Sequence, residues 1–155
     1  MFPQSHFLFA FFISEILVKL GFISHTIAIS IAILATLIDI DHLICFALKR
    51  HEISLKHAWN ECVRGRMYER TFIHHKIGFI LITALIVITY FINPTITLIL
   101  SIAYYSHIFL DYAHLNILRI RGKVTDNIEG YAIKINKFEI LFDVILLVGI
   151  ILLIT

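Results

Sequence analysis

Two carboxylates and an imidazole interrupt an apolar stretch at residues 35–48, ATLIDIDHLICFAL. They belong to Asp39, Asp41 and His42. An ionised carboxylate is costly in apolar surroundings when it stands alone, but it is tolerated beside a positive charge. A bound divalent cation would supply that charge, and carboxylate and imidazole groups are both common ligands of such ions. The stretch therefore raises the hypothesis of a metal site.

A second group of the same residue types lies further along the chain, in the stretch SIAYYSHIFLDYAHL. His107 and Asp111 are four residues apart and His114 is three further on, so all three share one face of a helix. Asp39 and His42 share a face in the same way. Helical bundles hold metals with His and carboxylate residues at this spacing on facing helices. The two stretches are therefore predicted to face one another.

Five apolar segments would carry these residues, at about 6–22, 27–48, 76–92, 96–118 and 138–155. Each approaches the roughly 20 residues that a helix needs to cross a membrane. Apolar residues make up 59% of the chain and charged residues 15%, whereas a soluble domain carries about 25% charged residues. The expected fold class is all-α, a multi-pass transmembrane helical bundle of about five spans in a single domain, residues 1–155.

The basic residues predict the orientation of this bundle. All Lys and Arg residues except Lys19 lie in two segments, 49–76 and 119–137. Because cytoplasmic loops are rich in Lys and Arg, both segments are expected inside, with the N-terminus cytoplasmic and the C-terminus outside. Within the first, Leu55, Trp59, Val63 and Met67 recur at helical spacing. They predict a short helix in the headgroup layer or, alternatively, a solvated loop anchored by the tryptophan.

This topology brings the polar residues to one depth. His6, His74 and the groups at 39–42 and 107–114 all fall within about 15 Å of the cytoplasmic edge. Residues that only join helices by hydrogen bonds, which is the alternative, would not be expected to share one layer. The common depth therefore favours a metal site.

Other ionisable residues have simpler explanations. His25 lies at the opposite end of its span, far from this layer, and Glu15 is spaced to pair with Lys19. Glu139 and Asp143 could join the site, but they also suit the positive end of the last helix.

Composition excludes several functions. A net charge of +2 is too small to indicate a nucleic-acid partner, and Cys45 and Cys62 have no spacing typical of a zinc ribbon or a disulfide framework. The N-terminal stretch lacks a basic region and a cleavage site, so it is interpreted as a retained first span rather than a signal peptide.

Three motifs in order, LIDIDH, ERTFIHH and YSHIFLD, resemble those of the YdjM-like membrane-bound metal-dependent hydrolases. That family shows the elements Pro-Asp-Ile-Asp-His, His-Arg-Gly-x-Thr-His-Ser and Ser-His-x-x-x-Asp, with a His near its N-terminus. The matching residues here are His6, Asp39, Ile40, Asp41, His42, Arg70, His74, Ser106, His107 and Asp111.

The chain departs from the family pattern at several positions. Ile38 replaces the proline, and Glu69 stands at the first His of the middle element. Thr71, Ile73 and His75 replace its Gly, Thr and Ser. Glu69 remains able to act as a ligand or base, and His75 adds a nitrogen, although an inactive member would show the same changes.

The resemblance implies a ligand set and roles. The expected metal ligands are His6, Asp39, His42, His74, His107 and Asp111. Asp41 would bridge two metals or accept a hydrogen bond from a ligating imidazole. Arg70 would contact a phosphate or serve as one of the topology-setting charges. Such ligands favour one or two zinc ions, with manganese or iron as alternatives.

The resulting functional hypothesis is a membrane-embedded hydrolase that activates water for attack on a phosphoester. Its expected substrate is a lipid or lipid-linked molecule of the cytoplasmic leaflet, attracted by the basic loops. Two alternatives stay open. One is a metal-ion or proton transporter, since intramembrane His and Asp also build ion paths. The other is a structural membrane protein without catalysis.

Overall fold

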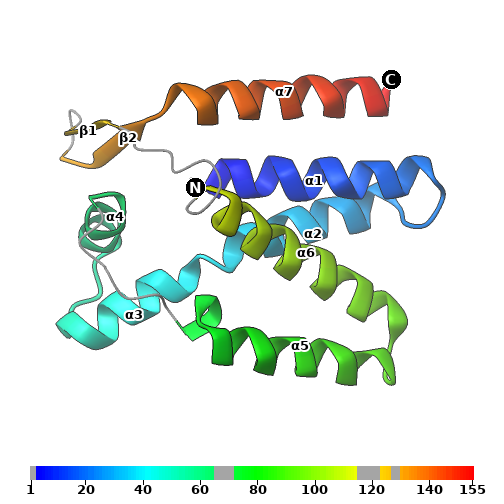
Figure 1. The fold of residues 1–155 in the computed structure, drawn as a ribbon, viewed down its shortest axis with the longest axis horizontal. Coiled ribbons are helices and arrows are strands. Elements are labelled where there is room, and N and C mark those ends of the chain that lie inside the picture. Colours follow the sequence, from blue (N-terminus) through cyan, green and yellow to red (C-terminus); the bar gives the residue numbers. More distant parts are fainter. Residues whose placement is uncertain (1–2, 65–71, 115–122, 127–129) are drawn as a thin grey trace.

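The computed structural model of the protein describes residues 3–64, 72–114, 123–126 and 130–155 (Figure 1). It is predominantly helical, as the sequence predicted. The helices are α1 Pro3–Lys19, α2 His25–Leu37, α3 Ile40–Arg50, α4 Leu55–Val63, α5 Lys76–Tyr90, α6 Pro94–Tyr112 and α7 Lys137–Ile154, with a 3₁₀ turn η1 at Phe72–His74. An antiparallel two-stranded ribbon, β1 Lys123–Asp126 and β2 Ala132–Ile135, was not expected.

Local sequence explains where several helices begin. The side chains of Ser24, Asn93 and Asn136 accept hydrogen bonds from the first backbone N–H groups of α2, α6 and α7. Pro94 occupies the first turn of α6, where its missing N–H has no cost. Gly21, at φ +78°, forms the turn that separates α1 from α2. These caps satisfy backbone N–H groups that have no partner within the first turn of each helix.

The second predicted span is divided where its acidic residues lie. Between α2 and α3 the backbone N–H groups of Asp39, Asp41 and His42 each bond three residues back, to Thr36, Ile38 and Asp39. This tighter winding has three residues per turn, so it places Asp39 and His42 on the same side. The chain contains neither Pro nor Gly at this point, and the sequence did not predict the junction.

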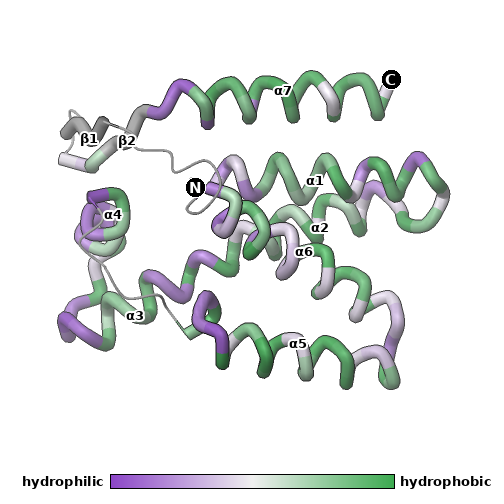
Figure 2. The backbone as a smooth tube through the Cα atoms, in the orientation of Figure 1, coloured by the Kyte–Doolittle hydropathy of each residue, from purple (hydrophilic) through white to green (hydrophobic). Residues whose placement is uncertain are grey.

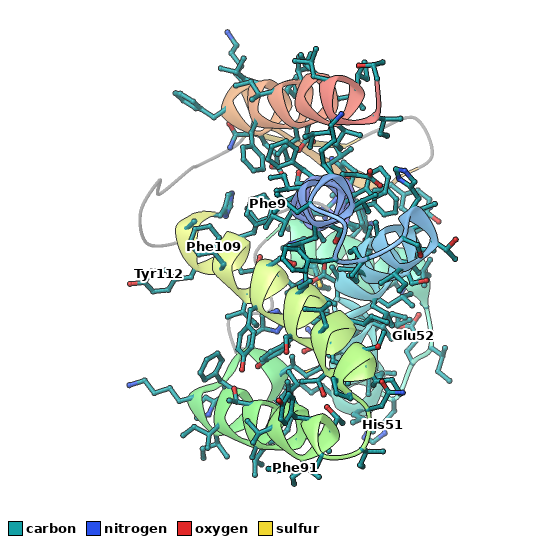
Figure 3. All side chains as sticks on the ribbon, turned by 90° about the vertical axis from the view of Figure 1, so that its right-hand side faces the viewer. Phe9, His51, Glu52, Phe91, Phe109 and Tyr112 are labelled. Atoms are coloured by element: carbon teal, nitrogen blue, oxygen red, sulfur yellow. The ribbon has the colours of Figure 1, made fainter. Side chains whose placement is uncertain are left out.

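Helix α1 is central and packs against α2, α6 and α7, while α5 packs on α6 (Figure 1). The core between α1, α2 and α6 contains Ala10, Ile31, Ala35 and Ala103. Small residues let helices approach closely, which membrane bundles commonly exploit. Aromatic residues add to the contact between α1 and α6, because the rings of Phe9 and Phe109 stack with centroids 5.9 Å apart (Figure 3).

Among the described residues, one helical segment is long and apolar enough to cross a membrane by length and composition, namely α2 and α3 taken together, His25–Arg50. Helix α5 is apolar but shorter. Helices form near all five expected spans, yet the five-span topology goes beyond this finding and stays a prediction. Hydrophilic residues gather at α3, α4, η1 and the first turn of α7, whereas α5 and the rest of α7 are hydrophobic (Figure 2).

Candidate metal centre

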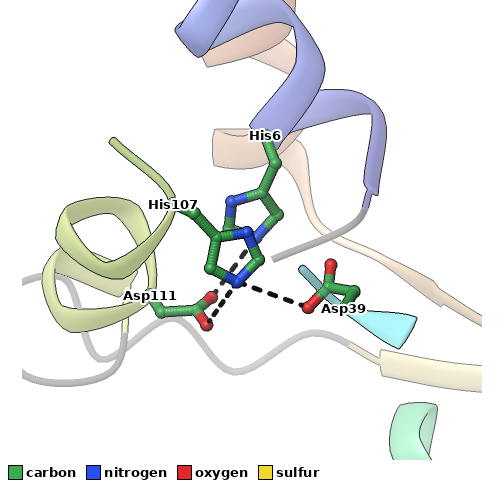
Figure 4. Close-up of side chains that lie close together, drawn as sticks. All are labelled: His6, Asp39, His107 and Asp111. Atoms are coloured by element: carbon green, nitrogen blue, oxygen red, sulfur yellow. Dashed lines mark ion pairs between the residues drawn. The ribbon is translucent and has the colours of Figure 1, made fainter. Parts of the chain in front are cut away.

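Six His and Asp side chains from distant segments come together at one end of α1 and α6. The first group contains His6, Asp39, His107 and Asp111, whose ligand atoms all lie within 4.8 Å of one another (Figure 4). A second group, formed by Asp39, His42 and His74, meets the same criterion. The two groups share Asp39, and together they contain all six residues that the sequence predicted as ligands.

The first group is tightly packed around two buried histidines. His107 Nε2 lies 3.5 Å from Asp39 Oδ1 and 3.5 Å from Asp111 Oδ2, and His6 Nε2 lies 3.3 Å from Asp111 Oδ1. The rings of His6 and His107 stack with centroids 4.0 Å apart, and these residues are only 1% and 0% exposed. Two buried imidazoles thus converge with two carboxylates that remain partly exposed, Asp39 at 22% and Asp111 at 20%.

A backbone carbonyl orients His107. Its Nδ1 lies 2.8 Å from the oxygen of Ala35, and because a carbonyl only accepts, this nitrogen must carry the proton. The other nitrogen, Nε2, is then left with a lone pair directed at Asp39 and Asp111. Metal-ligating histidines are commonly held in this way by an acceptor at the far nitrogen.

Asp41 plays the same part for His74. Asp41 Oδ2 lies 3.2 Å from His74 Nδ1, so an N–H at this position donates to the carboxylate. His74 Nε2 points the other way, 3.1 Å from Asp111 Oδ2 and 3.1 Å from His107 Nε2. Of the two roles that the sequence left open for Asp41, this geometry favours the acceptor rather than the bridging ligand.

His42 completes the second group at longer range. Its Nε2 is 3.9 Å from Asp39 Oδ1 and 4.0 Å from Asp41 Oδ1. The His42 ring stacks on that of His74 with centroids 5.2 Å apart. Because His42 is less buried than His6 and His107, this side of the centre is the one nearer the surface.

The charges of the site favour a cation. Burial lowers the pKa of His74, but hydrogen bonds with Asp111 and Asp41 outweigh this effect and raise it to about 9. At that pKa His74 is protonated at neutral pH and donates to Asp41 and Asp111 when no metal is bound. His6 Nδ1 has no hydrogen-bond partner among the described residues, and His6 Nε2 lies 3.3 Å from Asp111 Oδ1. A divalent cation held by the centre would replace the His74 proton as the positive charge between the carboxylates.

Several other predicted residues lie elsewhere. His75 is exposed, and its Nδ1 accepts from the backbone N–H of Ile77 to cap α5. His114 is buried at the end of α6 but belongs to neither ligand group. Glu69 and Arg70, expected to act in catalysis, fall outside the described residues, as does Met67 of the predicted surface helix.

The pairing of Glu15 with Lys19 is wrong. Glu15 instead contacts His25, whose Nδ1 lies 2.9 Å from Oε2, and Lys19 donates to the carbonyl of Leu153. The turn between α1 and α2 brings His25 over the buried carboxylate, and a contact across this turn has no signal in helical spacing. His25 lies far from the metal groups, as expected.

Sequence reasoning also missed the groups that hold the site in place. The role of the Ala35 carbonyl could not be predicted from residue types, because every residue has a backbone carbonyl. Tyr104 donates from its hydroxyl to the carbonyl of Ile73, which fixes η1 next to α6. Ser5 donates to Glu139 Oε1 at 3.1 Å, which ties α7 to α1 beside His6. Glu139 is thus buried in a helix contact.

No protein-family model, curated protein or solved structure matches this chain.

Proposed function

We propose that the protein is a membrane-embedded, zinc-dependent hydrolase that cleaves a phosphoester of a lipid or lipid-linked substrate at the cytoplasmic leaflet. The observation that carries this proposal is the convergence of six His and Asp residues into two ligand groups that share one carboxylate. Purely structural polar contacts between helices need only pairs of residues. Membership of the YdjM-like family is part of this proposal and depends on the three motifs.

The chemistry of the donors suits zinc. Every proposed ligand offers nitrogen or carboxylate oxygen, a set that zinc accepts and that manganese or iron also tolerates. The first group has four ligands and the second three, so one or two ions fit, with Asp39 between them. If these residues held a divalent cation, it would supply Lewis acidity for activating water and for polarising a phosphoryl oxygen.

The protein's own contribution is orientation. The Ala35 carbonyl and the Asp41 carboxylate hold His107 and His74 with Nε2 facing the centre. His6 contributes a buried imidazole that stacks on the ring of His107. The motifs assign Glu69 as a ligand or base and Arg70 as a phosphate contact. Both residues come shortly before η1 in the sequence, and η1 contains His74.

Exposed apolar surface supports the membrane location. Large apolar side chains stay exposed along α5 and α7, among them Ile80, Leu85, Leu141, Val144, Ile145 and Leu152. Soluble monomers rarely leave contiguous patches of this kind facing water. With the candidate span His25–Arg50, this pattern supports a location in the membrane. The count of five spans and the cytoplasmic N-terminus are part of the proposal and depend on the apolar segments and basic loops of the sequence.

The test combines metal content with activity. Detergent-purified protein should contain stoichiometric zinc and cleave a phospholipid or a chromogenic phosphodiester. Removal of the zinc with a chelator should abolish cleavage, and added zinc should restore it. His107→Ala should lose both metal and activity. His51→Asn is the matched control, because His51 is an exposed imidazole at φ +53°, a conformation that Asn also tolerates.

Two results would contradict the proposal in different ways. Protein that retains zinc yet cleaves no phosphoester would refute the hydrolase, and zinc flux into liposomes would then favour a transporter. Folded protein that binds no metal would refute the centre itself and favour a structural role.

A further inference from the structure

A pocket of about 440 Å³ lies between α3 and α4, apart from the metal centre. Its volume is within the range of sites for small molecules. The buried ring of Phe46 lies at the pocket, and the other lining residues are Arg50, Glu52, His57, Asn60, Glu61 and Arg64. None of them belongs to either ligand group, so the pocket needs an explanation of its own.

The pocket contains both signs of charge. Arg50 Nη2 lies 3.7 Å from Glu61 Oε2, which is too long for a hydrogen bond, so this contact leaves the guanidinium donors available. A guanidinium binds phosphate through two parallel hydrogen bonds. The guanidinium of Arg64 lines the same pocket as that of Arg50.

The pocket also holds two carboxylates. Glu52 Oε1 lies 2.7 Å from His57 Nδ1 and Glu61 faces Arg50, and a carboxylate can accept further hydrogen bonds beside such a partner. A cationic group of a ligand could use these acceptors, whereas a simple anion could not.

The wall formed by α4 is held in place by the β ribbon. Trp59 donates from Nε1 to the carbonyl of Ala132 at 2.9 Å. Asn60 donates to the carbonyl of Gly130 and accepts from the backbone N–H of Ala132. These contacts define the position of α4 opposite the end of α3, so the pocket is a built feature rather than a gap beside a loose helix.

The pocket also lies where lipid headgroups are expected. Arg50 is the last residue of the candidate span His25–Arg50, and the ends of spans lie at headgroup level. Glu52 lies at the outer edge of the molecule (Figure 3). Trp59 on α4 is a residue type that prefers the same layer.

We propose that this pocket binds a zwitterionic headgroup of the phosphoethanolamine type, a phosphodiester that carries a primary ammonium. Arg50 and Arg64 bind the phosphate, and Glu52 and Glu61 bind the ammonium. The proposal is independent of hydrolysis at the metal centre.

The test uses Trp59, the one tryptophan of the chain, as a fluorescent reporter next to the pocket. Glycerophosphoethanolamine, inorganic phosphate and ethanolamine are each titrated into the full-length protein in detergent. We expect glycerophosphoethanolamine to bind at least about tenfold more tightly than either part, because only it engages both signs of charge. Equal binding of inorganic phosphate would overturn the zwitterionic assignment, and no binding by folded protein would overturn the site.

Variants locate the binding. Arg50→Gln should weaken it at least about tenfold, because it removes a charge-assisted pair of hydrogen bonds. Lys49→Gln is the matched control, since Lys49 is the neighbouring cation of α3 but does not line the pocket. If Arg50→Gln fails to fold by circular dichroism, Glu61→Gln replaces it and should abolish the preference for glycerophosphoethanolamine over phosphate. An unchanged preference in a folded variant would refute the proposal.

A final arm identifies the source of the headgroup. In nanodiscs of mixed lipids, phosphatidylethanolamine that co-purifies with wild type but not with Arg50→Gln shows that a membrane lipid occupies the pocket. Binding of the soluble phosphodiester alone shows that the ligand is free in solution. His107→Ala should bind as wild type does, so failure of the metal centre and failure of the pocket are distinguishable.

Discussion

The two best-defined imidazoles of the centre owe their orientation to groups behind them. His107 is held by the Ala35 carbonyl and His74 by the Asp41 carboxylate, and each presents Nε2 to the centre. Such outer partners fix the tautomer of a ligand and strengthen its basicity. The hydrogen bonds that orient the ligating imidazoles therefore affect how tightly such a cluster binds a metal.

Asp41 is therefore expected to act through His74. Asp41→Ala should weaken zinc binding by about 10- to 100-fold, because His74 loses its acceptor. Asp41→Asn should cost clearly less, since the amide oxygen still accepts from Nδ1. Competition with a chelating dye measures both affinities. If Asp41 were a bridging ligand, the Asn and Ala variants would lose affinity equally.

The thiol of Cys62, on α4, is affected by the charges of Asp39 and Asp41. Burial, together with the charges of Asp39 and Asp41, raises the pKa of the Cys62 thiol to about 11. The thiolate is the reactive form, so alkylation at pH 8 should be about 100-fold slower than for an ordinary exposed thiol. It should speed up as the pH rises towards 11. Mass spectrometry of iodoacetamide-treated protein measures the rate, and a midpoint below pH 9 would show that the Cys62 thiol is not in this buried, negatively charged environment.

That the six candidate ligands come together could be predicted, because residue type and helical spacing are visible in the sequence. His107 and Asp111 share a face through their four-residue spacing, and the basic loops indicate a common depth for the rest. Residue type and spacing could not tell which of two adjacent histidines joins the centre. His74 joins the centre while His75 caps α5, and only the path of η1 decides between them.

At the scale of elements, hydrophobic blocks predict most helices, and spacing predicts α4. The α2–α3 junction was missed because its tight turn has no Pro or Gly to mark it. The β ribbon was missed because residues 119–137 are polar and basic, which is typical of a loop. The ribbon also has contacts with a distant part of the chain, namely the bonds from Asn60 to Gly130 and Ala132.

Close packing of α5 against η1 positions His74. A Cβ atom at Gly78 would overlap the backbone carbonyl oxygen of Phe72, the first residue of η1. Gly78→Ala should therefore displace η1 and weaken zinc binding at least about tenfold. Alanine favours a helix over glycine by about 1 kcal/mol, so a loss cannot come from helix propensity.

The control for Gly78→Ala is a second glycine in a helix. A Cβ atom at Gly149 meets only the ring of Phe12, a side chain that can move. Gly149→Ala should keep zinc affinity near that of wild type, measured by the same dye competition. Equal affinities for the two variants would show that η1 does not position the centre.

At the scale of the whole molecule, the exposed apolar faces of α5 and α7 and the hydrophilic end at α3 and α4 suit a bundle set in a membrane (Figure 2). The proposed orientation places the metal centre and the α3–α4 pocket on the cytoplasmic side. A lipid or lipid-linked substrate would then reach the centre from the inner leaflet.

This orientation predicts the labelling of single cysteines. In a background of Cys45→Ser and Cys62→Ser, Ile92→Cys and Ile53→Cys each introduce a thiol at an exposed position, 77% and 90% exposed respectively. A membrane-impermeant maleimide added to intact cells should label Ile92→Cys and leave Ile53→Cys unlabelled until the cells are opened. The opposite pattern would invert the topology, and labelling of both would refute five spans.

X-ray absorption at the zinc edge of zinc-loaded protein tests the central claim most directly. The account predicts stoichiometric zinc with nitrogen and oxygen ligands only, at about 2.0–2.2 Å, together with the scattering of imidazole rings. In His107→Ala the imidazole contribution should fall. A sulfur shell at about 2.3 Å, which would assign the metal to Cys45 or Cys62, or the absence of bound zinc in folded protein, would contradict it.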